Sequence, residues 1–156
     1  MEFHSHSYEE TTRFAQEYAK KLSPNDIILL EGDLGAGKTC FVNGLLSGLG
    51  FSQGGCSPTF TLVNEYPTTP PINHLDLYRI TSEDELYEMG FLEYLESGRV
   101  NIIEWPQIAA DILKQFPTTR ITIQHTENED ERIITIEKLK AACCRYICKN
   151  CNGCPV

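Results

Sequence analysis

The sequence predicts a three-layer α/β fold with a mixed, partly antiparallel central sheet. Two observations lead to this fold class. Residues 26–31 form a short apolar run that fits a buried strand, and a glycine-rich turn joins it to a helical pattern at 40–49. In addition, alternating segments occur in adjacent pairs and predict two hairpins, at 58–66 with 72–78 and at 120–125 with 132–137.

The remaining elements follow from local signals. Ser7 and Glu10 have capping-box spacing, so a helix is expected to begin after Ser7 and to continue to Leu22. Acidic residues open a short helix at 82–89, and residues 91–95 could continue it beyond Gly90. An apolar strand is expected at 100–105 and, after Pro106, a helix at 108–116.

The turn after the first strand reads GDLGAGKT, from Gly32 to Thr39. It matches G-x-x-x-x-G-K-[ST] at every fixed position, with a strand before it and a helix after it. This context predicts a P-loop NTPase-like fold, in which Lys38 reaches the β- and γ-phosphates and Thr39 ligates magnesium. A turn that only connects two elements explains the match less well. The nucleotide-binding residues expected here are Gly32, Asp33, Leu34, Gly35, Ala36, Gly37, Lys38, Thr39 and Cys40.

Two acids could complete such a site. Glu104 ends a predicted buried strand, and ligands in open α/β sheets bind at the carboxyl ends of strands. Asp76 lies in the second strand of the first hairpin. The expected catalytic residues are Lys38, Glu104 and Asp76, and the expected magnesium ligands are Thr39, Glu104 and Asp76. The alternative for each acid is a solvated strand end, and His74 is more typical of a structural residue.

Composition narrows the class of protein. The chain has 156 residues and a formal net charge of −9, which argues against gripping DNA or tRNA through a broad basic face. No apolar run approaches a membrane span, and the polar N-terminus does not fit a secretory signal, so we expect a cytoplasmic protein. No N-K-x-D stretch, the usual guanine-reading motif, occurs, and its absence favours ATP as the nucleotide.

The ordered motifs resemble the TsaE family, bacterial ATPases of tRNA threonylcarbamoyladenosine modification. The resemblance rests on GDLGAGKT and on SPTFTLVNEY at 57–66, HLDLYR at 74–79, ELYEMGFLEYL at 85–95 and IEWP at 103–106. It implies an ATPase that is weak without the partner proteins TsaD and TsaB and that reaches tRNA mainly through them. It also implies that Ser57–Thr59 sense the γ-phosphate, that Trp105 lies beside the site, and that a segment including Thr11 closes over the base.

Residues 1–138 are therefore expected to form one ATPase domain, followed by a cysteine-rich tail at 139–156 that departs from the family. Cys148, Cys151 and Cys154, with Cys144 nearby, have a spacing that could bind zinc or an iron–sulfur cluster, although a mobile tail fits better. Two other functions remain open: a small-molecule kinase on the same loop, which usually carries an arginine-rich lid, and a non-catalytic nucleotide-dependent binding module.

Overall fold

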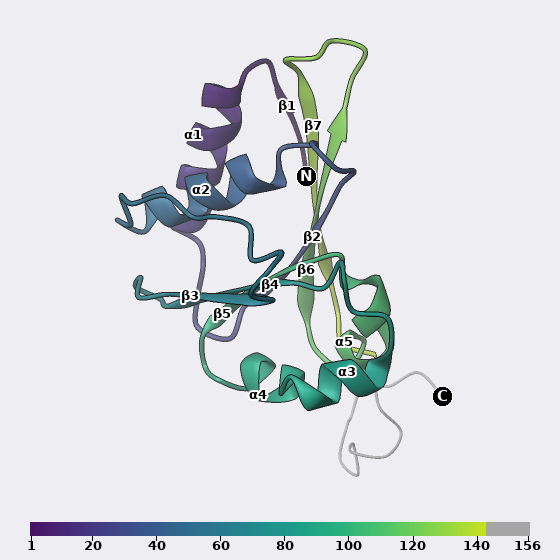
Figure 1. Cartoon of the computed structure of the whole chain (residues 1–156). Helices are drawn as coiled ribbons and strands as arrows, with labels where there is room; N and C mark the ends of the chain where they lie inside the picture. The colour runs from purple at the N-terminus through teal and green to yellow at the C-terminus, as the bar shows by residue number, and fades with distance from the viewer. Residues whose placement is uncertain (143–156) are drawn as a thin grey trace, which may run out of the picture.

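The structure, a computed structural model, describes residues 1–142. Within them the chain forms a single sheet with helices on both faces (Figure 1). The elements in chain order are β1 (Glu2–Ser5), α1 (Tyr8–Ala19), β2 (Ile27–Glu31), α2 (Lys38–Gly48), β3 (Val63–Tyr66), β4 (Ile72–Asp76), α3 (Glu83–Glu88), α4 (Phe91–Leu95), β5 (Val100–Glu104), the 3-10 helix η1 (Pro106–Ala109), α5 (Ala110–Leu113), β6 (Thr118–His125) and β7 (Arg132–Leu139).

The sheet has the strand order β1-β7-β6-β2-β5-β4-β3. The four central strands β6, β2, β5 and β4 are parallel. β7 and β1 add antiparallel strands at one edge, and β3 adds one at the other. The mixed sheet and both predicted hairpins are thus confirmed. Since the central strands are parallel, their carboxyl ends lie at the same end of the sheet, and the phosphate loop follows β2 there.

Each face of the sheet has its own apolar core. Ile28 and Leu30 of β2 pack in the cluster that contains α1 and α2 residues such as Ala15 and Phe41. The alternate residues Ile27 and Leu29 pack in a second cluster with α3, α4 and α5. Figure 1 shows α1 and α2 on one side of the sheet and α3, α4 and α5 on the other. The three-layer prediction is therefore confirmed.

The start of α1 follows the predicted capping pattern. The Ser7 Oγ accepts a hydrogen bond from the Glu10 backbone N–H at 3.2 Å, and the Glu10 carboxylate accepts one from the His6 backbone N–H at 2.8 Å. Both bonds satisfy donors near the helix N-terminus that would otherwise lack partners.

Two local predictions need correction, and one strand was not predicted. The strand expected at 58–66 begins only at Val63, because the Leu62 backbone N–H bonds to the Pro58 carbonyl in a turn and Leu62 has a positive φ of 64°. The helix expected at 108–116 is a 3-10 turn from Pro106 followed by a short α5. Residues 2–5, which were not predicted to be regular, form β1 because they pair with β7.

No helix within residues 1–142 is long and apolar enough to cross a membrane. The proposed metal-binding cysteines of the tail, Cys144, Cys148, Cys151 and Cys154, lie outside the described residues. The boundary at residue 138 remains a prediction, and β7 ends at Leu139.

Candidate functional site

The phosphate loop has the backbone geometry that its glycines permit. Gly37 is the N-cap of α2 with a φ of 106°, and no side chain caps the helix there. A Cβ on Gly32, which has a φ of 154°, would lie 2.6 Å from the Ile123 carbonyl oxygen. The loop can therefore pass close to β6 only with glycine at position 32. The first amides of α2 are left without a side-chain partner, at the helix end that favours an anion.

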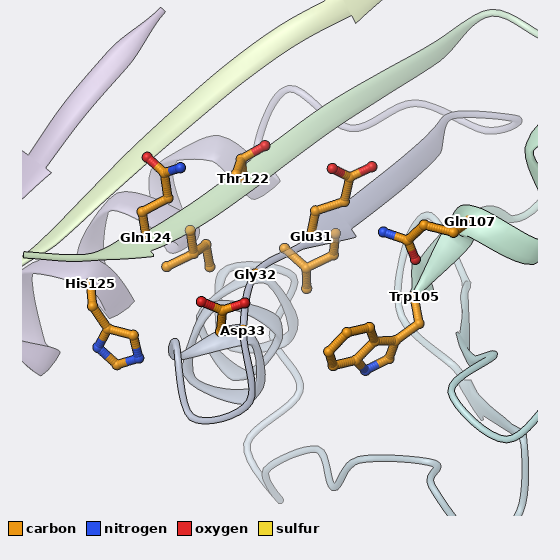
Figure 2. A pocket seen from close by; sticks show the side chains of 10 residues that line it. Glu31, Gly32, Asp33, Trp105, Gln107, Thr122, Gln124 and His125 are labelled. Atoms are coloured by element: carbon orange, nitrogen blue, oxygen red, sulfur yellow. The ribbon is translucent and has the colours of Figure 1, made fainter.

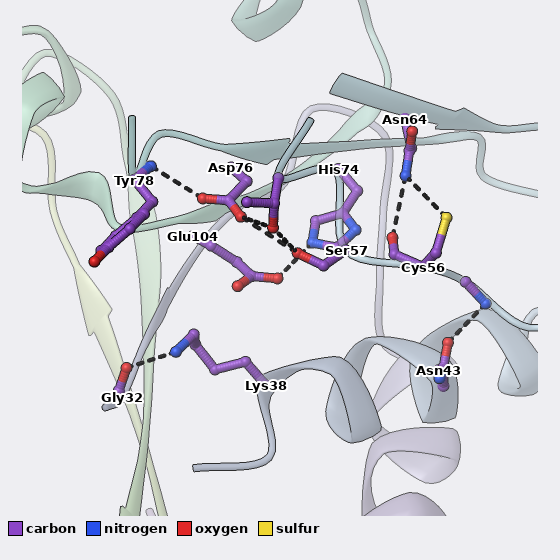
Figure 3. A network of polar contacts seen from close by, with 12 residues as sticks. Gly32, Lys38, Asn43, Cys56, Ser57, Asn64, His74, Asp76, Tyr78 and Glu104 are labelled. Carbon is purple, nitrogen blue, oxygen red and sulfur yellow. Dashed lines mark hydrogen bonds and ion pairs between the residues drawn. The ribbon is translucent and has the colours of Figure 1, made fainter. Parts of the chain in front are cut away.

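Lys38, at the start of α2, turns its ammonium group back toward the loop. Nζ donates to the Gly32 carbonyl at 2.6 Å (Figure 3). It also donates to the Asp33 carbonyl at 3.1 Å and lies 4.6 Å from the centre of the Trp105 ring. The side chain is 7% exposed and forms no ion pair with a carboxylate among residues 1–142. Its ammonium group thus directly contacts only neutral carbonyls and a ring face, which leaves it able to pair with an anionic ligand.

The two predicted acids lie side by side at the ends of neighbouring strands. Asp76 of β4 pairs in register with Glu104 of β5, and their residues are 4% and 3% exposed. Asp76 accepts hydrogen bonds from the hydroxyls of Ser57 at 3.3 Å and Thr59 at 3.1 Å, and from the backbone N–H of Tyr78 at 3.0 Å. The segment predicted to sense the γ-phosphate is therefore attached to one of the two acids.

One cavity of about 390 Å³ collects all the residues predicted to be catalytic or to bind the metal. It is lined by Leu34, Gly35, Gly37, Lys38, Thr39, Ser57, Thr59, Asp76, Tyr78, Glu104 and Trp105. The Thr39 hydroxyl has no hydrogen-bond partner among the described residues. A hydroxyl and two carboxylates are the hard oxygen donors that Mg²⁺ prefers. Residues 1–142 contain no group of three or more His, Cys, Asp or Glu residues placed to hold a metal, so phosphate oxygens and water would have to supply the other ligands.

The other predicted nucleotide-binding residues lie in different places. Gly32 and Asp33 line a second cavity of about 550 Å³, shared with Trp105, Thr122 and Gln124 (Figure 2). Thr11 and Cys40 line a third cavity of about 100 Å³, together with Gly37. Ala36 is fully buried. The structure thus groups Thr11 with Cys40 beside the start of α2, although the Thr11 hydroxyl already bonds to that of Ser5 at 2.7 Å.

Arg132 of β7 contacts the phosphate loop and was not singled out from the sequence. Its Nε donates to the Ala36 carbonyl at 2.9 Å, and it lines the third cavity with Thr11 and Cys40. The two bonded residues are 96 positions apart, and no local signal joins them. Only the pairing of β6 with β7 could have suggested that the start of β7 lies near the loop.

Cys40 is expected to react with iodoacetamide about tenfold more slowly than Cys56 at pH 8. Burial raises the pKa of the Cys40 thiol, so a smaller fraction is the reactive thiolate, whereas Cys56 is exposed. Peptide-level mass spectrometry over time would measure both rates. Mg-ATP should slow Cys40 further without affecting Cys56. Equal rates at the two cysteines would contradict the burial seen here.

A strand, a glycine loop and a helix lie at the centre of a three-layer fold with one mixed sheet. This arrangement defines a P-loop NTPase-like protein. Residues 5–134 match the family model described as threonylcarbamoyl adenosine biosynthesis protein TsaE. The chain therefore belongs to the TsaE family, as its motifs suggested.

Curated relatives agree with this assignment. The protein named tRNA threonylcarbamoyladenosine biosynthesis protein TsaE in Rickettsia typhi is 42% identical over 135 residues, which cover 85% of this chain and 91% of the relative. The protein of the same name in Bacillus subtilis is 41% identical, over 81% of this chain and 78% of the relative. The crystal structure of Bacillus subtilis YdiB superposes with a TM-score of 0.73 at 33% identity, covering 87% of this chain and 83% of that one.

Proposed function

We propose that this protein is a magnesium-dependent ATPase that acts in the cytoplasm with TsaD and TsaB in tRNA threonylcarbamoyladenosine biosynthesis. The observation that carries the proposal is the single cavity in which Lys38, Thr39, Asp76 and Glu104 meet at the end of the phosphate loop. Family membership supplies the pathway, because the matched relatives are named for this biosynthesis.

The residues of the cavity suit phosphate binding and phosphoryl transfer to water. The α2 N-terminus and the Lys38 ammonium would hold the phosphates, with Lys38 exchanging its loop carbonyls for phosphate oxygens. Thr39 and the two acids would hold Mg²⁺ together with ATP. The ion would neutralise part of the phosphate charge. The second oxygen of Glu104 has no hydrogen bond to another described residue, so it is free to orient a water molecule.

Partner dependence is supported by the rim of this cavity. Large apolar side chains are 84% exposed at Leu34, 85% at Phe60 and 59% at Tyr78. Leu34 and Tyr78 line the cavity, and Phe60 directly follows Thr59, which also lines it. Single exposed apolar residues are common, but a group around one cavity is typical of a surface that another protein covers. A partner bound there would shield the cavity from bulk solvent and hold the Ser57–Thr59 segment in place.

The kinase alternative has less support. Such an enzyme usually carries an arginine-rich lid and a pocket for the phosphate acceptor, whereas Arg79 and Arg132 are engaged in other contacts. Arg79 lies 4.7 Å from the centre of the Phe60 ring, and Arg132 is bound to backbone carbonyls. The non-catalytic module differs from the proposal only in the absence of stimulated turnover.

ATP hydrolysis measured with and without purified TsaD and TsaB tests the proposal. We expect the partners to raise the rate for the wild type. Lys38→Ala should remove the stimulated rate and weaken ATP binding at least about tenfold, because the lysine is a main phosphate contact. Lys20→Ala is the matched control, since Lys20 is 63% exposed and pairs with Glu17.

Other outcomes would identify the alternatives. Phosphate transfer to an added metabolite would favour the kinase. Tight ATP binding with no stimulated hydrolysis would favour the binding module. Equal losses in Lys38→Ala and Lys20→Ala would contradict the assigned role of the phosphate loop.

A further inference from the structure

His74 makes a buried contact with Glu104 that the phosphate-binding role does not explain. His74 Nε2 lies 2.7 Å from Glu104 Oε1, and the two side chains are 1% and 4% exposed (Figure 3). The contact follows from strand register. Since β4 and β5 are parallel and Asp76 pairs with Glu104, His74 lies two residues earlier on the same face of the sheet as both acids.

Only one of the two ring nitrogens of His74 has a hydrogen-bond partner among the described residues. His74 Nδ1 is buried and has no hydrogen-bond partner among residues 1–142. An ionised carboxylate can only accept hydrogen bonds, so the 2.7 Å contact with Glu104 Oε1 requires a hydrogen on Nε2. The ring proton is therefore best placed on Nε2, where it donates to the Glu104 carboxylate.

This bond leaves the two oxygens of Glu104 in different states. Oε1 is held by His74, and Oε2 has no hydrogen bond to another described residue. Glu104 lines the cavity of about 390 Å³ that also contains Lys38 and Thr39, which we call the phosphate cavity. Asp76 differs, because both of its oxygens accept hydrogen bonds. Oδ2 accepts from the hydroxyls of Ser57 and Thr59, and Oδ1 accepts from the backbone N–H of Tyr78. Glu104 is thus the acid with an oxygen available to the cavity, and His74 is its sole side-chain anchor among residues 1–142.

We propose that His74 is a positioning residue, which fixes the Glu104 carboxylate so that Oε2 faces the phosphate cavity. The inference rests on the proposed ATPase function for its catalytic consequence. Stability alone does not account for a buried polar pair here. Such pairs can often be replaced by apolar residues of similar volume without loss of stability, and the neighbouring Ile72 and Ile102 would pack against one.

Three variants separate positioning from packing. His74→Leu removes the donor and fills its space with an apolar side chain. His74→Gln can instead place an amide N–H near the present position of Nε2. Asn73→Ala is the matched control, because Asn73 is fully buried on the same strand but faces the other side of the sheet, where it bonds to Asn101. Partner-stimulated ATP hydrolysis, the KM for ATP and thermal unfolding are measured for all three.

We expect His74→Leu to lower kcat by about tenfold to a hundredfold with little change in KM, as happens when a residue that orients a ligating or catalytic group is lost. His74→Gln should recover most of that loss. Asn73→Ala should lower the unfolding temperature while kcat stays within about twofold of the wild type. If His74→Gln were as inactive as His74→Leu, or if kcat followed the unfolding temperature in all three variants, the positioning role would be wrong.

A spectroscopic measurement distinguishes failure of this inference from failure of the proposed function. Long-range ¹H–¹⁵N spectra of the full chain, assigned with His74→Gln, report which ring nitrogen of His74 carries the proton. We expect the Nε2–H form, with its shifts altered by Glu104→Leu. An Nδ1–H form would overturn the positioning role even if ATP is hydrolysed. Conversely, a wild type that shows the Nε2–H form but hydrolyses no ATP would refute the function and leave the contact intact.

Discussion

Replacing Glu104 with glutamine is expected to lower partner-stimulated ATP hydrolysis by roughly two to three orders of magnitude. Glutamine keeps the size of the side chain and can still accept the hydrogen bond from His74, so the change replaces only the Oε2 acceptor and its negative charge, with an amide N–H donor. ATP affinity should change only by about a few-fold, because Lys38 and the α2 N-terminus supply most phosphate contacts. Single-turnover hydrolysis together with nucleotide binding, followed by the fluorescence of Trp105, measures the two effects separately.

Asp76→Ala provides the informative comparison. Asp76 holds the Ser57 and Thr59 hydroxyls, so its loss should release that segment and weaken ATP binding as well as turnover. Glu65→Gln is the control for removing a carboxylate, since Glu65 is 54% exposed and pairs with Arg99 away from the cavity. A Glu104→Gln protein that hydrolyses ATP at the wild-type rate would contradict a direct role for this acid.

The positions of the phosphate loop and of the two acids could be predicted because their signals are local or depend only on strand order. Gly32, Gly37, Lys38 and Thr39 lie within eight residues, and the flanking strand and helix follow from the apolar pattern. Glu104 was expected near the loop because it ends a buried strand, and β5 does lie beside β2. Family membership, inferred from the ordered motifs, is confirmed by the family match.

Long-range contacts explain what the sequence did not reveal. Residues 2–5 are too short and polar to be predicted as a strand, and they become one because Phe3 pairs with Ile134. Residues 58–62 alternate like a strand, but the hydroxyls of Ser57 and Thr59 bond to Asp76 and the chain turns at Leu62. The contacts of His74 and Arg132 depend in the same way on strand register, which a single sequence does not specify.

Gly44→Val is expected to destabilise the protein by about 3 kcal/mol or more, which is a large share of the stability of a typical domain. Gly44 lies on α2 where it crosses α1. A Cβ there would lie 2.6 Å from the Ala15 Cβ and 2.7 Å from the Thr12 carbonyl oxygen. Helix propensity alone would favour replacing a glycine, so the predicted sign depends on this steric contact and not on the intrinsic preference.

The crossing of α1 and α2 also links stability to the site. Because α2 begins with Lys38 and Thr39, a displacement of α2 away from α1 should move both residues and weaken ATP binding in the fraction that stays folded. Ser47→Val is the matched control: it introduces the same side chain at an exposed position of α2, loses only the exposed hydrogen bond that Gln16 of α1 donates to Ser47, and should change stability by less than about 1 kcal/mol. Urea unfolding measures both free energies. If Gly44→Val unfolded at the same urea concentration as Ser47→Val, the two helices would not be packed as closely as the structure has them, and the phosphate loop would not depend on α1 for its position.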